Sequence, residues 1–359
     1  NLIINNCHSV SFNETVVIQY METTDTTIRI PSDRMKSEFS RILLDLGFTY
    51  QKAEKCAEIF TMNSLEGVYS HGVNRFSRFV NNIKEGLIKP GAIPSLNHRT
   101  GSLEQWNGNL GPGPLNATFA TDRVTELAAE NGIGLVALAH TNHWMRGGTY
   151  GWQAARKGFV FIAWTNTCPN MPAWGAKDPR LGNNPFVFAV PYNNDAIVLD
   201  FAMSQYSYGR METFDAQGKN LPYPGGFNKQ GELTTVPGEI LESWRVLPAG
   251  YWKGAGLSLL LDIMATILSG GLSTHQIKSC TSEYNVSQVF IAINIKSLQN
   301  FPAIENSIHQ IIEDLHKSTA ENETTRIRYP GENVAQIRTA NLRDGIPVNR
   351  EIWEKILAL

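Results

Sequence analysis

The sequence predicts an α/β protein of three layers, in which helices cover both faces of a mixed sheet and the chain ends add a helical lobe. Its 359 residues are 42% hydrophobic, which is enough apolar material for a large core in two structural lobes. From residue 114 onward, strand-like apolar segments alternate with segments of helical periodicity. Two of these strands are separated only by Asn193-Asn194-Asp195, so this pair is expected to form an antiparallel hairpin in a mixed sheet.

A helical lobe is expected over residues 28–110, because apolar side chains recur at helical spacing in three segments. Pro31-Ser32-Asp33 is typical of a helix start, and a second helix is predicted over residues 51–62. The third helix is predicted to begin at Ser70 and to end near Gly86.

Residues 111–300 are expected to form the α/β domain that binds cofactor and substrate. Helices are predicted at 114–131, 150–156 and 257–268, and strands at 135–139, 159–164, 186–191, 197–201 and 288–295. Residues 90–109 are expected to be a turn-rich crossing, and residues 205–250 a long surface excursion that serves as a flap.

The two ends of the chain are predicted to differ. Residues 1–27 are expected to be an extension outside the core fold, with a β-like stretch at 15–20 and no signal-peptide pattern. Residues 301–359 are expected to form two helices that pack back on the helical lobe.

Composition and charge exclude several classes of protein. The net charge is -2, only 18% of residues are charged, and no basic block is present, so no nucleic-acid partner is expected. Apolar runs stay short of the roughly 18 residues that predict a membrane span, so no membrane association is expected. The four cysteines are far apart and form no CxxC pair, which predicts reduced thiols in a cytoplasmic protein and no zinc site.

The stretch from Ser70 to Arg75 brings a hydroxyl, an imidazole and a guanidinium into six residues. His71 and Arg75 are four residues apart, so a continuous helix would place both side chains on one face. An imidazole moves a proton near neutral pH, and a guanidinium holds a carboxylate with two hydrogen bonds. The pattern predicts a site for an acid that carries a reducible or oxidisable oxygen. In the alternative interpretation, Ser70 caps the helix and the other two residues are solvated.

A second polar cluster, His140 to Tyr150, follows a predicted strand. Ligands in open α/β sheets bind beyond the carboxyl ends of strands. His140 and His143 lack a third ligand nearby, so an anion or a cofactor is favoured over a metal, and no metal is expected. A capped turn without a ligand is the alternative.

Two glycine-rich stretches need a structural interpretation. Gly132-Ile-Gly134-Leu-Val-Ala137 matches a dinucleotide-binding pattern, but it follows a helix and opens a strand, so we interpret it as a helix end and a turn. Gly250 to Gly256 precedes an apolar helix, where free amides beside Lys253 suit a phosphate or a nucleotide ring.

These segments together resemble the malate/L-lactate dehydrogenase type 2 family, from about residue 28 to the C-terminus. The matching segments are Glu66–Phe76, His143–Gly148, Tyr150–Ala155, Met171-Pro172, Trp174–Lys177, Ser207–Gly209 and Gly250–Gly254. The resemblance implies an NAD-binding fold without a Rossmann fingerprint, a homodimer, and reduction of 2-oxo acids by NADH, with NADPH as the alternative.

The resemblance also assigns roles to residues. It implies that His71 is the proton donor; we expect Arg75 to hold the substrate carboxylate, and Ser70 and His143 to bond its oxygens. It implies cofactor contacts at Ala196, Ile197, Val198, Leu199, Asp200, Phe201, Ala202, Trp252, Lys253, Gly331, Glu332 and Asn333.

The chain departs from the family pattern in two places. Residues 182–185 read Gly-Asn-Asn-Pro, where the family commonly has Gly-Thr-Asn-Pro. Some relatives carry a catalytic lysine after the strand that ends near Trp164, whereas Thr165-Asn-Thr-Cys168 has none, which favours His71 as the acid.

The expected activity is NADH-dependent reduction of the C2 carbonyl of a small, sugar-derived 2-oxo acid. The first alternative is a sibling dehydrogenase for malate, lactate, ureidoglycolate or a cyclic imine acid. The alternative of another class is a non-catalytic protein that binds acids or nucleotides.

Overall fold

The computed structural model describes residues 27–277 and 283–359. The predicted β-like stretch at 15–20 and all of the predicted extension except Thr27 lie outside the described residues. Thr27 itself begins strand β1 (Thr27–Ile30), which pairs antiparallel with β14 (Ile346–Asn349) near the C-terminus.

A seven-stranded mixed sheet forms the centre of the molecule, with the strand order β2-β3-β4-β13-β5-β8-β9. Its strands are β2 (Ser95–Thr100), β3 (Leu103–Asn107), β4 (Ile133–Thr141), β5 (Phe159–Thr165), β8 (Phe186–Tyr192), β9 (Asp195–Phe201) and β13 (Val286–Asn294). Only β3 and β4 run parallel, and the other neighbours are antiparallel. The predicted β8–β9 hairpin is confirmed; Asn193 and Asn194 turn the chain with φ of 50° and 57°, as a tight hairpin turn requires.

The prediction of a turn-rich crossing over residues 90–109 is wrong, because β2 and β3 form a hairpin there. Every residue of β2 is exposed. A strand with no buried face has no alternating apolar pattern, so its sequence resembles a loop.

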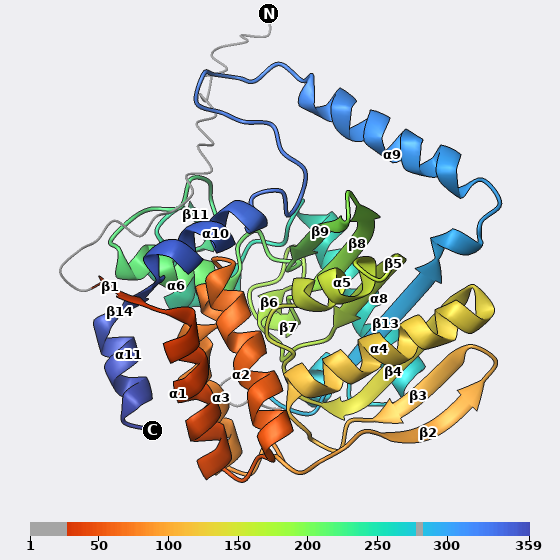
Figure 1. Ribbon diagram of the computed structural model, residues 1–359. Helices are drawn as coiled ribbons and strands as arrows, with labels where there is room; N and C mark the ends of the chain where they lie inside the picture. Colours follow the sequence, from red (N-terminus) through yellow and green to blue (C-terminus); the bar gives the residue numbers. More distant parts are fainter. Residues whose placement is uncertain (1–26, 278–282) are drawn as a thin grey trace, which may run out of the picture.

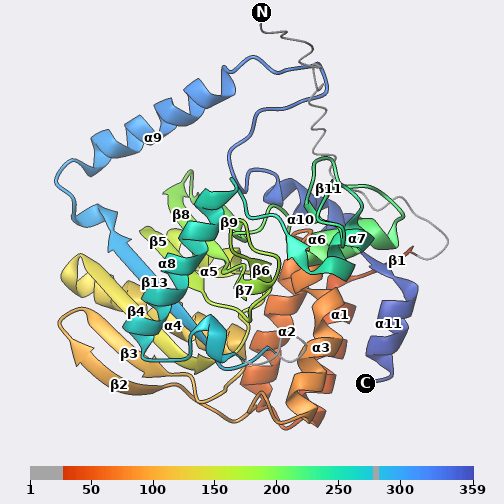
Figure 2. The same cartoon turned by 180° about the vertical axis from the view of Figure 1, so that it is seen from behind.

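Helices cover both faces of the sheet, as predicted (Figures 1 and 2). Helices α4 (Gly113–Asn131) and α5 (Gly148–Ala155) pack on one face, in the same apolar cluster as Val136 and Leu138 of β4. Helix α8 (Trp252–Ser269) packs on the other face, in the cluster that holds Ala137. Alternate residues of one strand therefore serve opposite layers.

The helical lobe has its own core, built from α1 (Ser32–Asp45), α2 (Tyr50–Leu65), α3 (Val73–Lys84) and α11 (Arg350–Leu357). The rings of Phe39 and Phe76 stack there with centroids 3.9 Å apart.

The C-terminal helices divide between two places. Helix α10 (Val334–Asp344) contacts α2, and α11 contacts α3. Helix α9 (Phe301–His316) lies away from the lobe in both views, so its predicted packing on the lobe is wrong (Figures 1 and 2). The reason is the path of the chain, because β13 delivers it to the end of the sheet remote from the lobe (Figure 1).

Residues 205–250 carry more structure than the predicted surface excursion. The segment contains α6 (Tyr208–Ala216), α7 (Pro237–Ser243) and a small sheet of β10 (Gly226–Phe227), β11 (Leu233–Thr234) and β12 (Arg245–Val246). Strands of two residues are too short for a periodic signal. A further two-stranded sheet joins β6 (Met171–Pro172) and β7 (Pro179–Leu181).

Two further sequence expectations meet the structure. Among the described residues, α8 alone is long and apolar enough to span a membrane, and a third of this helix is buried in the protein. Cys168 is disulfide-bonded, which contradicts the expectation of reduced thiols, whereas Cys56 is a buried free thiol.

Candidate active site

The chain breaks its helix between His71 and Arg75. Tyr69–His71 forms a single 3-10 turn, and α3 begins at Val73 after Gly72. The predicted continuous helix from Ser70 is therefore wrong, and Ser70 does not cap α3. The first amide of α3, the backbone N of Val73, instead donates to Ser64 Oγ at 2.8 Å.

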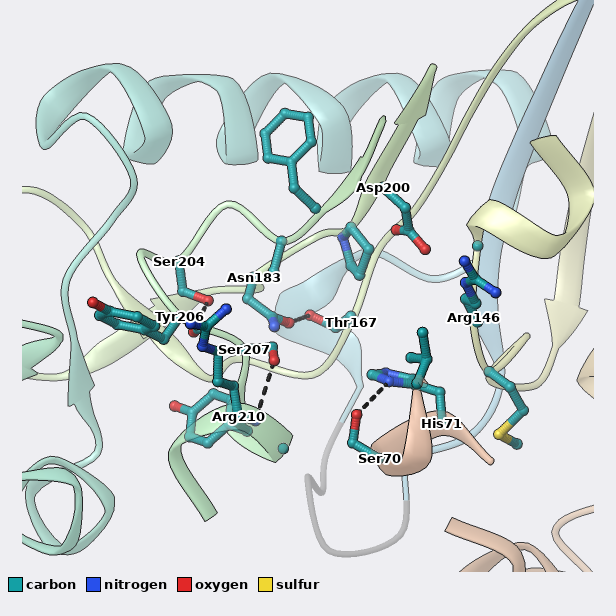
Figure 3. Close-up of a pocket in the computed structure, with 18 of the residues that line it drawn as sticks. Ser70, His71, Arg146, Thr167, Asn183, Asp200, Ser204, Tyr206, Ser207 and Arg210 are labelled. Carbon is teal, nitrogen blue, oxygen red and sulfur yellow. Dashed lines mark hydrogen bonds between the residues drawn. The ribbon is translucent and has the colours of Figure 1, made fainter. Parts of the chain in front are cut away.

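His71 and Arg75 nevertheless line one cavity of about 710 Å³, together with Ser70 and His143. The helical lobe supplies one wall, and the strand ends β5, β8 and β9 with the start of α6 supply the others. Figure 3 shows Ser70 and His71 near Arg146, with Asn183, Ser204 and Arg210 across the cavity.

The His71 imidazole is neutral in the ligand-free site. Burial, and then the charges of Arg75 and Arg146, lower its pKa from 6.5 to about 3. Its Nδ1 lies 3.0 Å from Ser70 Oγ, and its backbone carbonyl accepts from Asn63 Nδ2 at 2.9 Å. Ring and backbone are thus both held in place.

The His143 ring lies beside that of His71, with centroids 5.7 Å apart and planes 20° apart. Its Nδ1 accepts a hydrogen bond from the Met145 backbone N at 2.9 Å. A backbone amide can only donate, so the proton of neutral His143 sits on Nε2. Burial, followed by Arg75 and His71, lowers the pKa of His143 well below its usual value.

Arg75 makes no hydrogen bond or ion pair with any residue that the structure describes. Burial and the neighbouring Arg78 lower its pKa, against the opposing charges of Glu283 and Glu212. A guanidinium rarely stays buried without a partner. Its unused donors are therefore suited to an anionic ligand.

A buried ion-pair network beside the site was not predicted. Glu66, at the end of α2, pairs with Arg146 after β4 and with Arg338 of α10, the latter at 2.8 Å. The Arg146 guanidinium also lies 4.5 Å from the Trp152 ring centroid. The network joins three distant segments, so spacing in the sequence carries no signal for it.

Only some of the residues that the resemblance assigns to the cofactor line this cavity. Val198, Asp200, Phe201, Ala202 and Gly331 line it, whereas Ala196, Ile197, Leu199, Glu332 and Asn333 do not. Trp252 and Lys253 lie outside it, at the exposed start of α8. The period of two along β9 explains why residue 199 points away from residues 198 and 200.

Gly331 lines the cavity where the C-terminal turn packs against Trp152 and β9. Gly331 has φ of +90°, and a Cβ there would lie 3.1 Å from Trp152 and 3.3 Å from the Val198 carbonyl. The turn is bonded to β9 by the Val198 N, which donates to the Pro330 carbonyl at 3.1 Å. A side chain at position 331 would press on Trp152 and β9, so glycine lets this turn pack directly against them.

Asp200 supplies a carboxylate to this wall. Its Oδ2 accepts from the Gly148 N, at the start of α5, at 2.7 Å. Burial raises the pKa of Asp200, while this amide and Arg146 oppose the rise.

The two glycine-rich stretches have different places in the structure: the first lies between α4 and β4, and the second begins α8. Gly132 ends α4 with φ of +83° and Gly134 lies in β4, which confirms the helix-end interpretation. Gly250 and Tyr251 precede α8 with φ of 63° and 61°.

No group of three or more His, Cys, Asp or Glu that could hold a metal occurs in the described part of the chain.

Comparison with known proteins identifies the class. The sequence pattern that defines the malate/L-lactate dehydrogenase family matches residues 30–357. The chain therefore belongs to this family of oxidoreductases, whose members use a nicotinamide cofactor.

Individual relatives narrow the comparison. The chain is similar to 2,3-diketo-L-gulonate reductase of Escherichia coli strain 536, at 43% identity over 92% of this chain and 100% of the relative. Its structure is similar to malate dehydrogenase from Pyrococcus horikoshii OT3, at 30% identity, a TM-score of 0.84, and coverage of 92% and 94% of the two chains. Malate dehydrogenase from Entamoeba histolytica is 25% identical, with a TM-score of 0.86 over 92% and 96% of the chains.

Proposed function

We propose that this protein reduces the C2 carbonyl of a sugar-derived 2-oxo acid with NADH, and that the substrate is 2,3-diketo-L-gulonate. The observation that carries the proposal is the position of Arg75, which has no partner among the described residues, beside His71 in one cavity. The name of the 43%-identical relative supports the substrate.

The residues act as follows in this proposal. Arg75 binds the C1 carboxylate with two parallel hydrogen bonds and so fixes which carbonyl faces the cofactor. The nicotinamide, when bound, supplies a hydride. His71 delivers a proton to the oxygen that becomes an alkoxide, while Ser70 orients its ring. His143 donates from Nε2 to a substrate oxygen.

We place the cofactor along the wall of Val198, Asp200 and Gly331. NADH is the expected cofactor, and NADPH is the alternative. The dissociation constants of the two cofactors, measured by quenching of protein fluorescence, test this preference. A cytoplasmic location belongs to the same proposal, since the cytoplasm holds the pool of NADH.

An absorbance assay tests the activity. NADH oxidation is followed with 2,3-diketo-L-gulonate, oxaloacetate, pyruvate and a cyclic imine acid. We expect the highest kcat/KM with 2,3-diketo-L-gulonate. Turnover of another substrate alone would indicate the sibling dehydrogenase, and the absence of any oxidation would indicate a binding protein.

Substrate binding should bring a proton into the site. The pKa of about 3 leaves His71 neutral at pH 7, whereas the acid role needs the imidazolium. A bound carboxylate offsets the charge of Arg75 and raises the pKa of His71. We expect the uptake of up to one proton when NADH-loaded enzyme binds oxamate, whose carbonyl stands in for the ketone.

Calorimetry in two buffers of different ionisation enthalpy measures this uptake at pH 7. Affinity for oxamate should weaken as pH rises, by about tenfold per unit if one full proton is taken up. His71→Asn should abolish the uptake. If the native enzyme takes up no proton, His71 does not bind substrate in its acid form.

We propose a homodimer formed through α8. The outward face of this helix exposes Leu260, Ile263, Met264 and Ile267 at 43–69% of their surface, at helical spacing. An apolar stripe of this kind marks a protein interface, and a self-complementary patch suits two-fold symmetry. Trp252 and Lys253 lie at the exposed start of the same helix, so this dimer places them at or beside the interface.

Ile263→Asp with Ile267→Asp should convert the dimer to a monomer, because two charges would be buried in an apolar contact. Light scattering after gel filtration measures the mass. Ile93→Asp is the control, since Ile93 is 68% exposed and lies in the loop before β2 rather than on α8. An unchanged mass in the double variant would exclude α8 as the interface.

A further inference from the structure

Two asparagines in the cavity wall bond each other through both ends of one amide. The backbone N of Asn183 donates to Asn170 Oδ1 at 2.7 Å, and Asn170 Nδ2 donates to Asn183 Oδ1 at 2.9 Å. Thr167 Oγ1 adds a second donor to Asn183 Oδ1 at 3.2 Å. Asn183 is one of the two positions where the chain departs from the family pattern.

This arrangement fixes which way the Asn183 amide points. The backbone amide of Asn183 can only donate, so the atom of Asn170 that it meets is an oxygen. The other atom of Asn170 is therefore the nitrogen, which donates, and the atom of Asn183 that it meets must be an oxygen. The Nδ2 of Asn183 is left on the opposite side, and no residue of the described chain accepts from it.

The neighbouring side chains do not compete for this donor. In Figure 3, Asn183 lies between Thr167 and Ser204 on the wall across from His71. Ser204 Oγ donates to the Tyr206 carbonyl at 2.8 Å and Ser207 Oγ accepts from the Arg210 N, and neither hydroxyl is hydrogen-bonded to Asn183 Nδ2. The Asn183 amide is therefore an oriented donor that none of the described residues uses.

We propose that Asn183 is a specificity-determining residue, whose Nδ2 donates a hydrogen bond to a substrate oxygen beyond the reacting C2 carbonyl. The inference rests on the proposed function and deepens it. It assigns the substrate to the polyoxygenated 2-oxo acids, which carry a hydroxyl or carbonyl acceptor from C3 onward. An acid with a hydrocarbon tail leaves this donor unpaired, and a site built to hydrogen-bond its substrate rejects such analogues strongly.

The test compares two substrates in two variants. Asn183→Asp keeps the oxygen that Asn170 and Thr167 need and replaces only the donor, whereas Asn183→Thr inserts the residue common in the family. We measure kcat/KM for 2,3-diketo-L-gulonate and for 2-oxobutanoate. The ratio of the two values should fall by about 10- to 100-fold in both variants, as expected for the loss of one buried hydrogen bond. The added charge of Asn183→Asp acts on both anions, so it largely cancels in the ratio.

Asn300→Asp, at the exposed start of α9, is the matched control and should leave the ratio unchanged. An equal loss with both substrates would overturn the inference. So would a weaker dissociation constant for NADH with an unchanged ratio, because Asn183 would then contact the cofactor. A native enzyme that oxidises NADH with no 2-oxo acid would overturn the proposed function first, and this inference with it.

Discussion

Replacing His71 by alanine should lower turnover by about 10²–10⁴-fold, the usual contribution of a positioned general acid. The affinity for NADH should stay nearly unchanged, because His71 belongs to the turn before α3, whereas we assign the cofactor to β9 and the turn at Gly331. Steady-state kinetics with 2,3-diketo-L-gulonate gives the first quantity, and fluorescence titration with NADH gives the second.

Ser70→Ala is the matched control for this experiment. It removes the hydroxyl that orients the His71 ring, 3.0 Å away, but keeps the imidazole itself, so its loss of turnover should be smaller than that of His71→Ala. Unchanged turnover in His71→Ala would remove this residue from the acid role. A comparable loss in NADH affinity would indicate instead that the ring supports the cofactor.

Arg75→Lys should lower kcat/KM by about 10- to 100-fold, mostly through KM. Lysine keeps the positive charge but cannot make two parallel hydrogen bonds to one carboxylate. The loss of one hydrogen bond to a charged group has about this size. Kinetics with 2,3-diketo-L-gulonate and with its methyl ester shows how much of the loss comes from carboxylate binding, because the ester lacks the charge that Arg75 binds.

The preference of the enzyme for acid over ester should shrink in Arg75→Lys. Arg180→Lys makes the same exchange at an exposed arginine paired with Asp178, and should leave kcat/KM unchanged for both acid and ester. If acid and ester lose equally in Arg75→Lys, Arg75 does not bind the carboxylate.

The parts of the fold that the sequence predicts are those with a buried face. Strands β8 and β9 are apolar and joined by Asn193-Asn194, so both their existence and their antiparallel pairing could be predicted. Strand β2 is exposed at every position, and the strands of the 205–250 segment are two residues long. Neither kind carries the periodicity on which a prediction depends.

The site divides in a similar way. A hydroxyl, an imidazole and a guanidinium within six residues identified His71 and Arg75 as candidate site residues, although the predicted helix that joins them is broken. The Glu66–Arg146 and Asn170–Asn183 pairs could not be predicted, because their partners come together only when separate segments fold. The chemistry of an imidazole beside a guanidinium predicted a proton donor and a carboxylate anchor, whereas the cofactor contacts came from the family resemblance.

The break at Gly72 gives the two candidate residues separate supports. A Cβ at this position would clash with the Ser64 hydroxyl and lie 3.0 Å from the Phe60 carbonyl, so α2 excludes any side chain there. His71 is held by the α2 residue Asn63, and α3, which carries Arg75, begins on the α2 residue Ser64. One helix therefore sets the distance between acid and anchor, so a change in the length of the accepted substrate, during evolution or engineering, would have to act through α2.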